Sequence, residues 1–334
     1  MYAAPLNLDL FFKKVFSDTR IAKEFLQVFF DVTIEEIELV RVKHKLTDSA
    51  TLVEFDFRCK INGKYIIIEM QQAYKTGVVK RFYVYHTLTS GVQLEFLPKK
   101  VTINKKTGKK SEQPSYEGLL PVYTLIWMAD DTLNFDIETI TFALSPEKVV
   151  DFIRNNELWA TKDVEKICRV REKILVLLDN KSKDLDFLPQ NKLVFAFQKN
   201  IVKSLKFQPY KEWFEFAEAT QNRQNTKKDF EKFEKNKTLM EVLERIKKDV
   251  LDEVELDALS DWDRAFFELA EWEEDIKKKQ EEVAQKQEKM AKEAKEKVIL
   301  ANKLGVDKAL IATIFKLTIE EVNEIIENQS GSKA

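Results

Sequence analysis

The sequence predicts a mixed α/β (α+β) fold with the element order α-β-β-β-α-β, followed by a helical C-terminal region. Three observations lead to this prediction. A hairpin signature lies between residues 52 and 71, apolar residues at helical spacing flank it, and helical periodicity dominates from Ser145 onward, with no proline after Pro209. With 334 residues, 44% hydrophobic and 34% charged, the chain can bury one large core or two smaller ones.

The hairpin signature is the sequence LVEFDFRCKINGKYIIIEMQ. Two runs of β-branched and aromatic residues flank Asn62-Gly63, the strongest short signal for a two-residue turn of type I′. This turn pairs Ile61 with Lys64 and fixes every pair that follows. On one face of the ribbon the pairs are apolar: Cys59 with Ile66, Phe57 with Ile68, and Phe55 with Met70.

The other face of the ribbon carries carboxylates, because the same register places Asp56 opposite Glu69 and Glu54 opposite Gln71. Like charges directly opposite one another destabilise a sheet, and a divalent cation with oxygen ligands would remove the conflict. Alternation alone also allows a solvated face for both carboxylates. However, residues 65–68 are apolar on both sides, as in a strand that is buried on both faces.

Asp56, twelve intervening residues and Glu69-Met70-Gln71 resemble the active-site core of the PD-(D/E)XK nuclease superfamily. More narrowly, the chain resembles the Rpn-type recombination-promoting nucleases, or PD-(D/E)XK family transposases, whose last motif is typically IEMQ, as in residues 68–71. The resemblance covers residues 6–145 and, weakly, the last thirty. Three further segments match: Asp9 with Phe12-Lys13 in the first helix, Arg81 with Tyr85 in the next helix, and Leu120-Pro121-Val122 before the following strand.

The resemblance implies a restriction-endonuclease-like core and a DNA endonuclease that depends on Mg²⁺ or Mn²⁺. Asp56 and Glu69 would ligate the metal together with the Met70 carbonyl. Gln71 replaces the usual Lys and would orient the attacking water. Glu54 would hold the Gln71 amide or a second metal. The expected supporting or phosphate-binding residues are Asp9, Lys13, Glu54, Arg81 and Tyr85, although Arg81 and Tyr85 also fit an ordinary helix surface and core anchor.

Charge is distributed unevenly along the chain. Residues 1–110 hold 19 Lys and Arg against 12 Asp and Glu, a net charge of +7, which leaves −9 for the remainder of a chain whose total is −2. A basic region that contains the candidate carboxylates suits a polyanionic partner such as DNA, although such an imbalance is also common on ordinary surfaces. The sequence is also compatible with a homo-oligomer.

Several other chemistries and environments are excluded by the sequence. Cys59 and Cys168 give no disulfide framework or metal-ligand spacing. The chain has no P-loop, dinucleotide fingerprint, H-E-x-x-H or G-x-S-x-G motif. It has no signal-peptide pattern and no apolar run long enough to span a membrane, so no membrane partner and a reducing cytoplasmic environment are expected.

The remaining elements of the nuclease-like region follow from periodicity. We expect a helix over residues 8–30 that is interrupted near Ser17-Asp18, a strand over 36–46, a helix over 76–94 and a buried strand over 122–128. Residues 98–117 read as a loop whose lysines would follow a DNA backbone, if they are not simply solvated. These lysines are Lys99, Lys100, Lys105, Lys106, Lys109 and Lys110.

Four regions are expected: a nuclease-like domain over 1–145, a helical region over 146–262, a long charged helix over 263–303 and a small helix-turn-helix-like hairpin over 304–330. Helical patterns cover 147–178 and 191–220, and a capping box lies at Thr318–Glu321. A second hypothesis is that the nuclease fold is degenerate and the chain is an interaction scaffold that works through its charged C-terminal helices.

Overall fold

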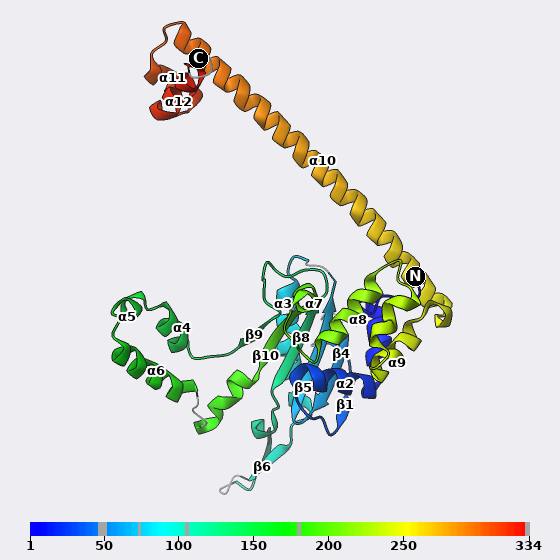
Figure 1. Cartoon of the computed structure of the whole chain (residues 1–334). Coiled ribbons are helices and arrows are strands. Elements are labelled where there is room, and N and C mark those ends of the chain that lie inside the picture. The colour runs from blue at the N-terminus through cyan, green and yellow to red at the C-terminus, as the bar shows by residue number, and fades with distance from the viewer. Residues whose placement is uncertain (46–51, 73–74, 104–106, 179–181, 331–334) are drawn as a thin grey trace. The chain divides into compact units, whose positions relative to one another are not determined.

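The computed structural model describes residues 1–45, 52–72, 75–103, 107–178 and 182–330 and contains two compact units, Met1–Leu256 and a second that begins at Asp257. The first unit contains a mixed six-stranded sheet (Figure 1), so the predicted mixed α/β class is confirmed. In spatial order the strands are β1 (Ile37–Leu39), β4 (Phe57–Ile61), β5 (Lys64–Gln71), β8 (Val122–Met128), β10 (Lys192–Phe197) and β9 (Thr139–Ala143).

The central hairpin has the predicted register, with Ile61 opposite Lys64 and Phe57 opposite Ile68. Asn62 and Gly63 have φ values of 44° and 69°, the left-handed conformation that both central residues of a type I′ turn require. The ladder ends at the Phe57–Ile68 pair, so the three pairs predicted beyond it are absent from the ladder: Asp56 with Glu69, Phe55 with Met70, and Glu54 with Gln71. The Phe55 N–H donates instead to the Val42 carbonyl, and the Phe55 side chain lies in one cluster with Ile67.

Glu54 lies instead in a separate two-stranded sheet formed by β2 (Lys43–His44) and β3 (Val53–Glu54), where it is opposite Lys43. The strand predicted over residues 36–46 is accordingly two short strands, β1 and β2. The chain leaves the main sheet between β1 and β2. The alternation of apolar and charged residues continues across this point, so the sequence pattern predicted one strand instead of two.

Three parallel strands end together. β5 pairs with β8, which places Gln71 opposite Met128, and β8 pairs with β10, which places Met128 opposite Phe197. We call this the C-terminal end of the sheet. The helix α3 (Val78–Val92) follows β5 and confirms the helix expected over 76–94, and β8 coincides with the strand expected over 122–128.

Helices cover both faces of the sheet. On one face Trp127 packs against Phe12 of α1 (Asp9–Phe16), Phe25 of α2 (Thr19–Phe30) and Phe214 of α8 (Lys211–Gln221), with ring centroids 6.4, 5.4 and 4.2 Å apart. On the other face Phe82 of α3 lies in one cluster with Ile126 and Met128. The interruption expected near Ser17-Asp18 is confirmed, because the Asp18 side chain caps α2.

Two predictions from the sequence are wrong. Residues 192–197 form β10 rather than part of a helix, because a short apolar run fits a buried strand as well as a helix. Residues 98–117 are largely a hairpin of β6 (Lys99–Ile103) and β7 (Lys110–Pro114) rather than a loop. Lys105 and Lys106 lie outside the described residues.

The remaining helices follow the expected pattern in outline. The charged helix α10 begins before residue 263, and the capping box is confirmed, because Thr318 N–H donates to Glu321 Oε2 at 2.7 Å and Glu321 N–H donates to Thr318 Oγ1 at 3.1 Å. None of the described helices is both long and apolar enough to cross a membrane. The helices are α4 (Glu147–Arg154), α5 (Asn156–Ala160), α6 (Val164–Leu178), α7 (Gln198–Lys203), α9 (Lys237–Ile246), α10 (Glu253–Lys303), α11 (Lys308–Phe315) and α12 (Ile319–Ser330).

Candidate active site

Asp56 and Glu69 lie next to each other at the end of the central hairpin. The Asp56 N–H is 3.4 Å from Glu69 Oε1, and the Met70 N–H donates to Asp56 Oδ2 at 2.7 Å. The Asp56 carboxylate therefore accepts a hydrogen bond beyond the point where the ladder stops. Glu69 is only 2% exposed and the Asp56 side chain 15%, which excludes the alternative of a solvated carboxylate face.

Burial dominates the protonation of this pair. Burial raises the pKa of Asp56 to about 7, with the Met70 hydrogen bond opposing the shift and the Asp9 carboxylate adding to it. Burial and then the charge of Asp56 raise the pKa of Glu69 well above its usual range. Within the described residues no Lys or Arg forms an ion pair with Glu69. The nearby charges of Arg81 and Lys13 lower the pKa of Glu69, but burial and the Asp56 carboxylate outweigh them.

The first helix brings a cation to the carboxylates. Lys13 Nζ lies 3.0 Å from Asp9 Oδ2, 3.2 Å from Glu54 Oε1 and 3.8 Å from Asp56 Oδ1. Asp9 and Lys13 are four residues apart and so share one face of α1. Burial lowers the pKa of Lys13, but these three carboxylates outweigh it and raise the pKa overall. Lys13 is therefore charged at neutral pH.

The helix α3 contributes the other expected residues. Arg81 Nη2 donates to Gln71 Oε1 at 2.8 Å, so α3 holds the amide for which Glu54 was one expected partner. The Arg81 guanidinium also lies 5.8 Å from the centre of the Tyr85 ring. Burial and then the charge of Glu69 raise the pKa of the Tyr85 hydroxyl. All of the expected site residues thus lie around the C-terminal end of β5.

Two residues near this end of the sheet were missed by sequence reasoning. The Asp130 N–H donates to the Gln72 carbonyl at 2.8 Å, and Lys199 Nζ lies 3.7 Å from Asp130 Oδ1. Burial raises the pKa of Asp130. Its position shortly after a buried strand could have indicated it, because parallel neighbouring strands end together. Lys199 could not be placed without recognising β10.

The lysines of the β6–β7 hairpin lie far from the carboxylates. The hairpin joins the chain before β8 begins, and Val122 is opposite Tyr65, at the other end of β5 from Gln71. Six residues of strand separate Tyr65 from Gln71, or about 20 Å. Figure 1 shows β6 at the opposite end of the sheet from α7. The described lysines of this hairpin therefore lie at the other end of β5 from the carboxylates, and the expectation that they follow a DNA backbone stays a prediction.

The donor set suits a hard divalent cation. Asp56 and Glu69 offer buried carboxylate oxygens, the ligands that Mg²⁺ and Mn²⁺ prefer. Among the described residues there is no cluster of three or more His, Cys, Asp or Glu side chains placed to hold a metal, so the two carboxylates would be joined by other oxygen ligands, such as water or the Met70 carbonyl. No family model, curated protein or solved structure matches the chain.

Proposed function

We propose that the chain is a DNA endonuclease of the recombination-promoting PD-(D/E)XK type that depends on Mg²⁺ or Mn²⁺. The observation that carries the proposal is the buried Asp56–Glu69 pair, whose raised pKa values mark two carboxylates that need a cation. The order helix, antiparallel strands β1, β4 and β5, helix, and parallel strand β8 supports such a core. The cytoplasmic environment remains part of the proposal.

The carboxylates of Asp56 and Glu69 would hold the ion together with the Met70 carbonyl. When bound, the ion would polarise the scissile phosphate and lower the pKa of a bound water. Lys13 supplies the positive charge that Gln71 cannot, because its ammonium is 3.8 Å from Asp56 Oδ1. A lysine on the first helix thus compensates for the glutamine in the strand motif.

Gln71 and Arg81 act together in this proposal. Arg81 holds the Gln71 amide oxygen, which fixes the orientation of the amide, and the amide in turn orients the attacking water. A guanidinium carries five N–H groups, so Arg81 can also donate to a phosphate oxygen. Tyr85 packs beneath Arg81 and limits its movement.

Nicking of supercoiled plasmid tests the proposal. The wild-type chain should nick DNA with Mg²⁺ or Mn²⁺ and not with EDTA, and Asp56→Asn and Glu69→Gln should abolish nicking. Glu117→Gln is the matched control, because Glu117 pairs with Lys100 far from the site. A wild-type chain that binds metal and DNA without nicking would favour the scaffold hypothesis instead.

A further inference from the structure

The loop between α7 and α8, residues 204–208, combines exposed apolar side chains with lysines. Leu205 is 103% exposed and Phe207 is 90% exposed, and Lys203 and Lys206 alternate with them along the chain. In the described chain neither lysine forms an ion pair, and Phe207 makes no ring contact. Single exposed apolar residues are common, but two within three positions beside unpaired lysines indicate a binding surface.

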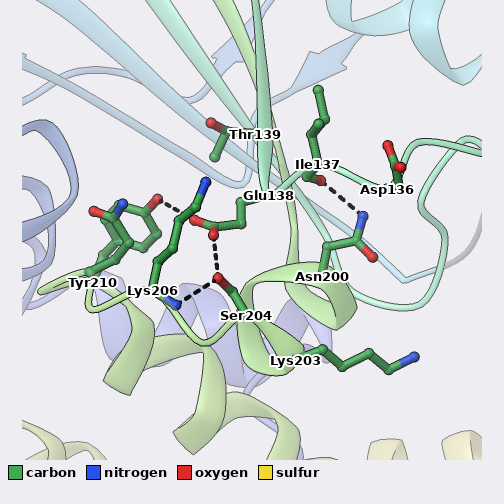
Figure 2. A pocket seen from close by; sticks show the side chains of 10 residues that line it. Asp136, Ile137, Glu138, Thr139, Asn200, Lys203, Ser204, Lys206 and Tyr210 are labelled. Carbon is green, nitrogen blue, oxygen red and sulfur yellow. Dashed lines mark hydrogen bonds between the residues drawn. The ribbon is translucent and has the colours of Figure 1, made fainter.

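This loop is fixed to the C-terminal end of the sheet. The Ser204 hydroxyl and the Tyr210 hydroxyl both donate to the Glu138 carboxylate (Figure 2). The Glu138 carbonyl accepts from the N–H of Phe197, the last residue of β10. Lys211 Nζ also donates to the Ser204 carbonyl at 2.5 Å. The loop is therefore held at the end of a strand, and its exposed side chains project from a fixed base.

The position of the loop can be compared with that of the Asp56 and Glu69 carboxylates through the strands β10 and β5. β10 lies two strands from β5, so the ends of these strands are about 10 Å apart. Hydrogen bonds join them: Gln72 Nε2 donates to the Asn7 carbonyl at 3.1 Å, and Asn7 Nδ2 donates to Gln198 Oε1 at 3.0 Å. The loop itself begins after α7, a further six residues or about 9 Å of helix beyond Gln198, so a nucleic acid that contacts both the Asp56–Glu69 pair and the loop would have to extend across that distance.

A cavity lies beside the loop. Its volume is about 610 Å³, and Asn200, Lys203, Lys206 and Tyr210 are among the residues that line it, together with the acidic Asp136 and Glu138. Figure 2 shows Lys203 extending away from the contact between Glu138 and Ser204. The volume falls within the range of pockets that hold small ligands. Leu205 and Phe207 are not among the lining residues, so a base stacked on Phe207 would lie outside the cavity and only its phosphate would face the lysines there.

We propose that residues 203–207 bind an unpaired nucleotide of the DNA substrate, with Phe207 stacked on its base and Lys203 and Lys206 beside the phosphates. The faces of a paired base are covered by its neighbours in the duplex, so an exposed ring stacks readily only on an unpaired base. This inference rests on the proposed nuclease function and defines its substrate as DNA with a single-stranded stretch near the cut. An anionic membrane would also suit these residues, but their place at the same end of the sheet as the carboxylates favours DNA.

Binding measurements on the full chain test this inference. The parent carries Glu69→Gln to prevent cleavage, and its affinity is measured by fluorescence anisotropy for a blunt duplex and for the same duplex with a short single-stranded gap. Phe207→Ala should weaken binding to the gapped DNA about tenfold and leave binding to the blunt duplex unchanged. The change of Lys203 and Lys206 to Ala together should reduce the salt dependence of binding, because two phosphate contacts are lost.

Matched controls lie at the other end of the sheet. Phe96→Ala removes an aromatic ring that is 73% exposed, and changing Lys109 and Lys110 to Ala removes the same charge. Neither control should alter binding to gapped DNA.

Three results would overturn the inference. Phe207→Ala could bind gapped DNA as tightly as the parent, or it could lose binding to phosphatidylserine vesicles while DNA binding is unchanged. The parent could also fail to bind DNA. Plasmid nicking by the wild-type chain tests the nuclease proposal separately. A result against nucleotide binding by residues 203–207 can therefore be distinguished from a result against nuclease activity.

Discussion

At the scale of single residues, the site places its positive charge on a helix rather than on the strand motif. Gln71 cannot carry charge, whereas Lys13 contacts Asp9, Glu54 and Asp56. The sequence resemblance indicated Lys13 as a supporting residue, but only the structure shows its distance from the carboxylates. In the candidate site, the strand β5 thus supplies Gln71 at the motif position, whereas the helix α1 supplies the positive charge of Lys13.

If the chain acts as the proposed nuclease, Lys13→Met should reduce the plasmid nicking rate by about 100-fold, since the positive charge nearest the Asp56 carboxylate is lost. Lys14→Met is the matched control, because Lys14 pairs with Glu255 at 2.6 Å, outside the site, and should leave nicking unchanged. Equal rates for the two variants in single-turnover nicking would show that Lys13 is not part of the catalytic arrangement.

Gln71→Lys tests the contact with Arg81. The new ammonium would stand where the amide oxygen now accepts from the guanidinium, so two cations would repel each other. We expect nicking to fall about tenfold while metal affinity remains, and Arg81→Met in the same chain to restore part of the loss. A Gln71→Lys chain with higher activity than the wild type would contradict this arrangement.

At the scale of elements, the central hairpin could be predicted closely because its turn is local. Asn62-Gly63 fixed the register of the pairs between residues 57 and 68 without tertiary information. The end of the ladder was not predictable, because it depends on the Asp56 side chain, which accepts the Met70 N–H. β10 was missed because its apolar run does not distinguish a strand from a helix.

Gly63→Ala tests the contribution of the turn. Gly63 has a φ of +69°, and an added Cβ would meet nothing within 4 Å, so the cost arises from backbone conformation alone. We expect about 1 kcal/mol of destabilisation in urea unfolding. Gly91→Ala in α3 also meets nothing within 4 Å and has an ordinary helical conformation, so it should instead stabilise the fold by a similar amount. An unchanged free energy of unfolding for Gly63→Ala would mean that the turn can adopt another backbone conformation without loss of stability.

At the scale of the whole molecule, the candidate site lies entirely within the first compact unit, Met1–Leu256. The second unit has its own small core around Val298, Ile311 and Val322. The regions expected over 1–145 and 146–262 do not separate at residue 145, because β8 and β10 belong to one sheet. The sequence could not show this, since the contact joins segments far apart in the chain.

A chain that ends at residue 262 should retain the metal-dependent nicking rate of the full chain, because it keeps the sheet and the ion pair of Lys14 with Glu255. Glu69→Gln in the shortened chain is the control and should be inactive. Loss of nicking in a shortened chain that still unfolds cooperatively would assign a necessary role to the C-terminal helices, as the scaffold hypothesis expects.

The central claim is that Asp56 and Glu69 together bind one divalent ion. Their pKa values are raised in the fold, so both groups hold protons at a pH where they are ordinarily ionised, and a metal must displace those protons. Without metal, this same shift makes the fold less stable as the pH rises from about 4 to about 7. Metal affinity should rise over this range and level off only once both Asp56 and Glu69 have lost their protons.

Calorimetric titration of Mn²⁺ into the full chain, in two buffers with different ionisation enthalpies, measures binding and proton release together. We predict one Mn²⁺ per chain, release of protons on binding below pH 7, and loss of binding in Glu69→Gln but not in Glu117→Gln. Binding to Glu69→Gln with the affinity and proton release of the wild type would contradict the account.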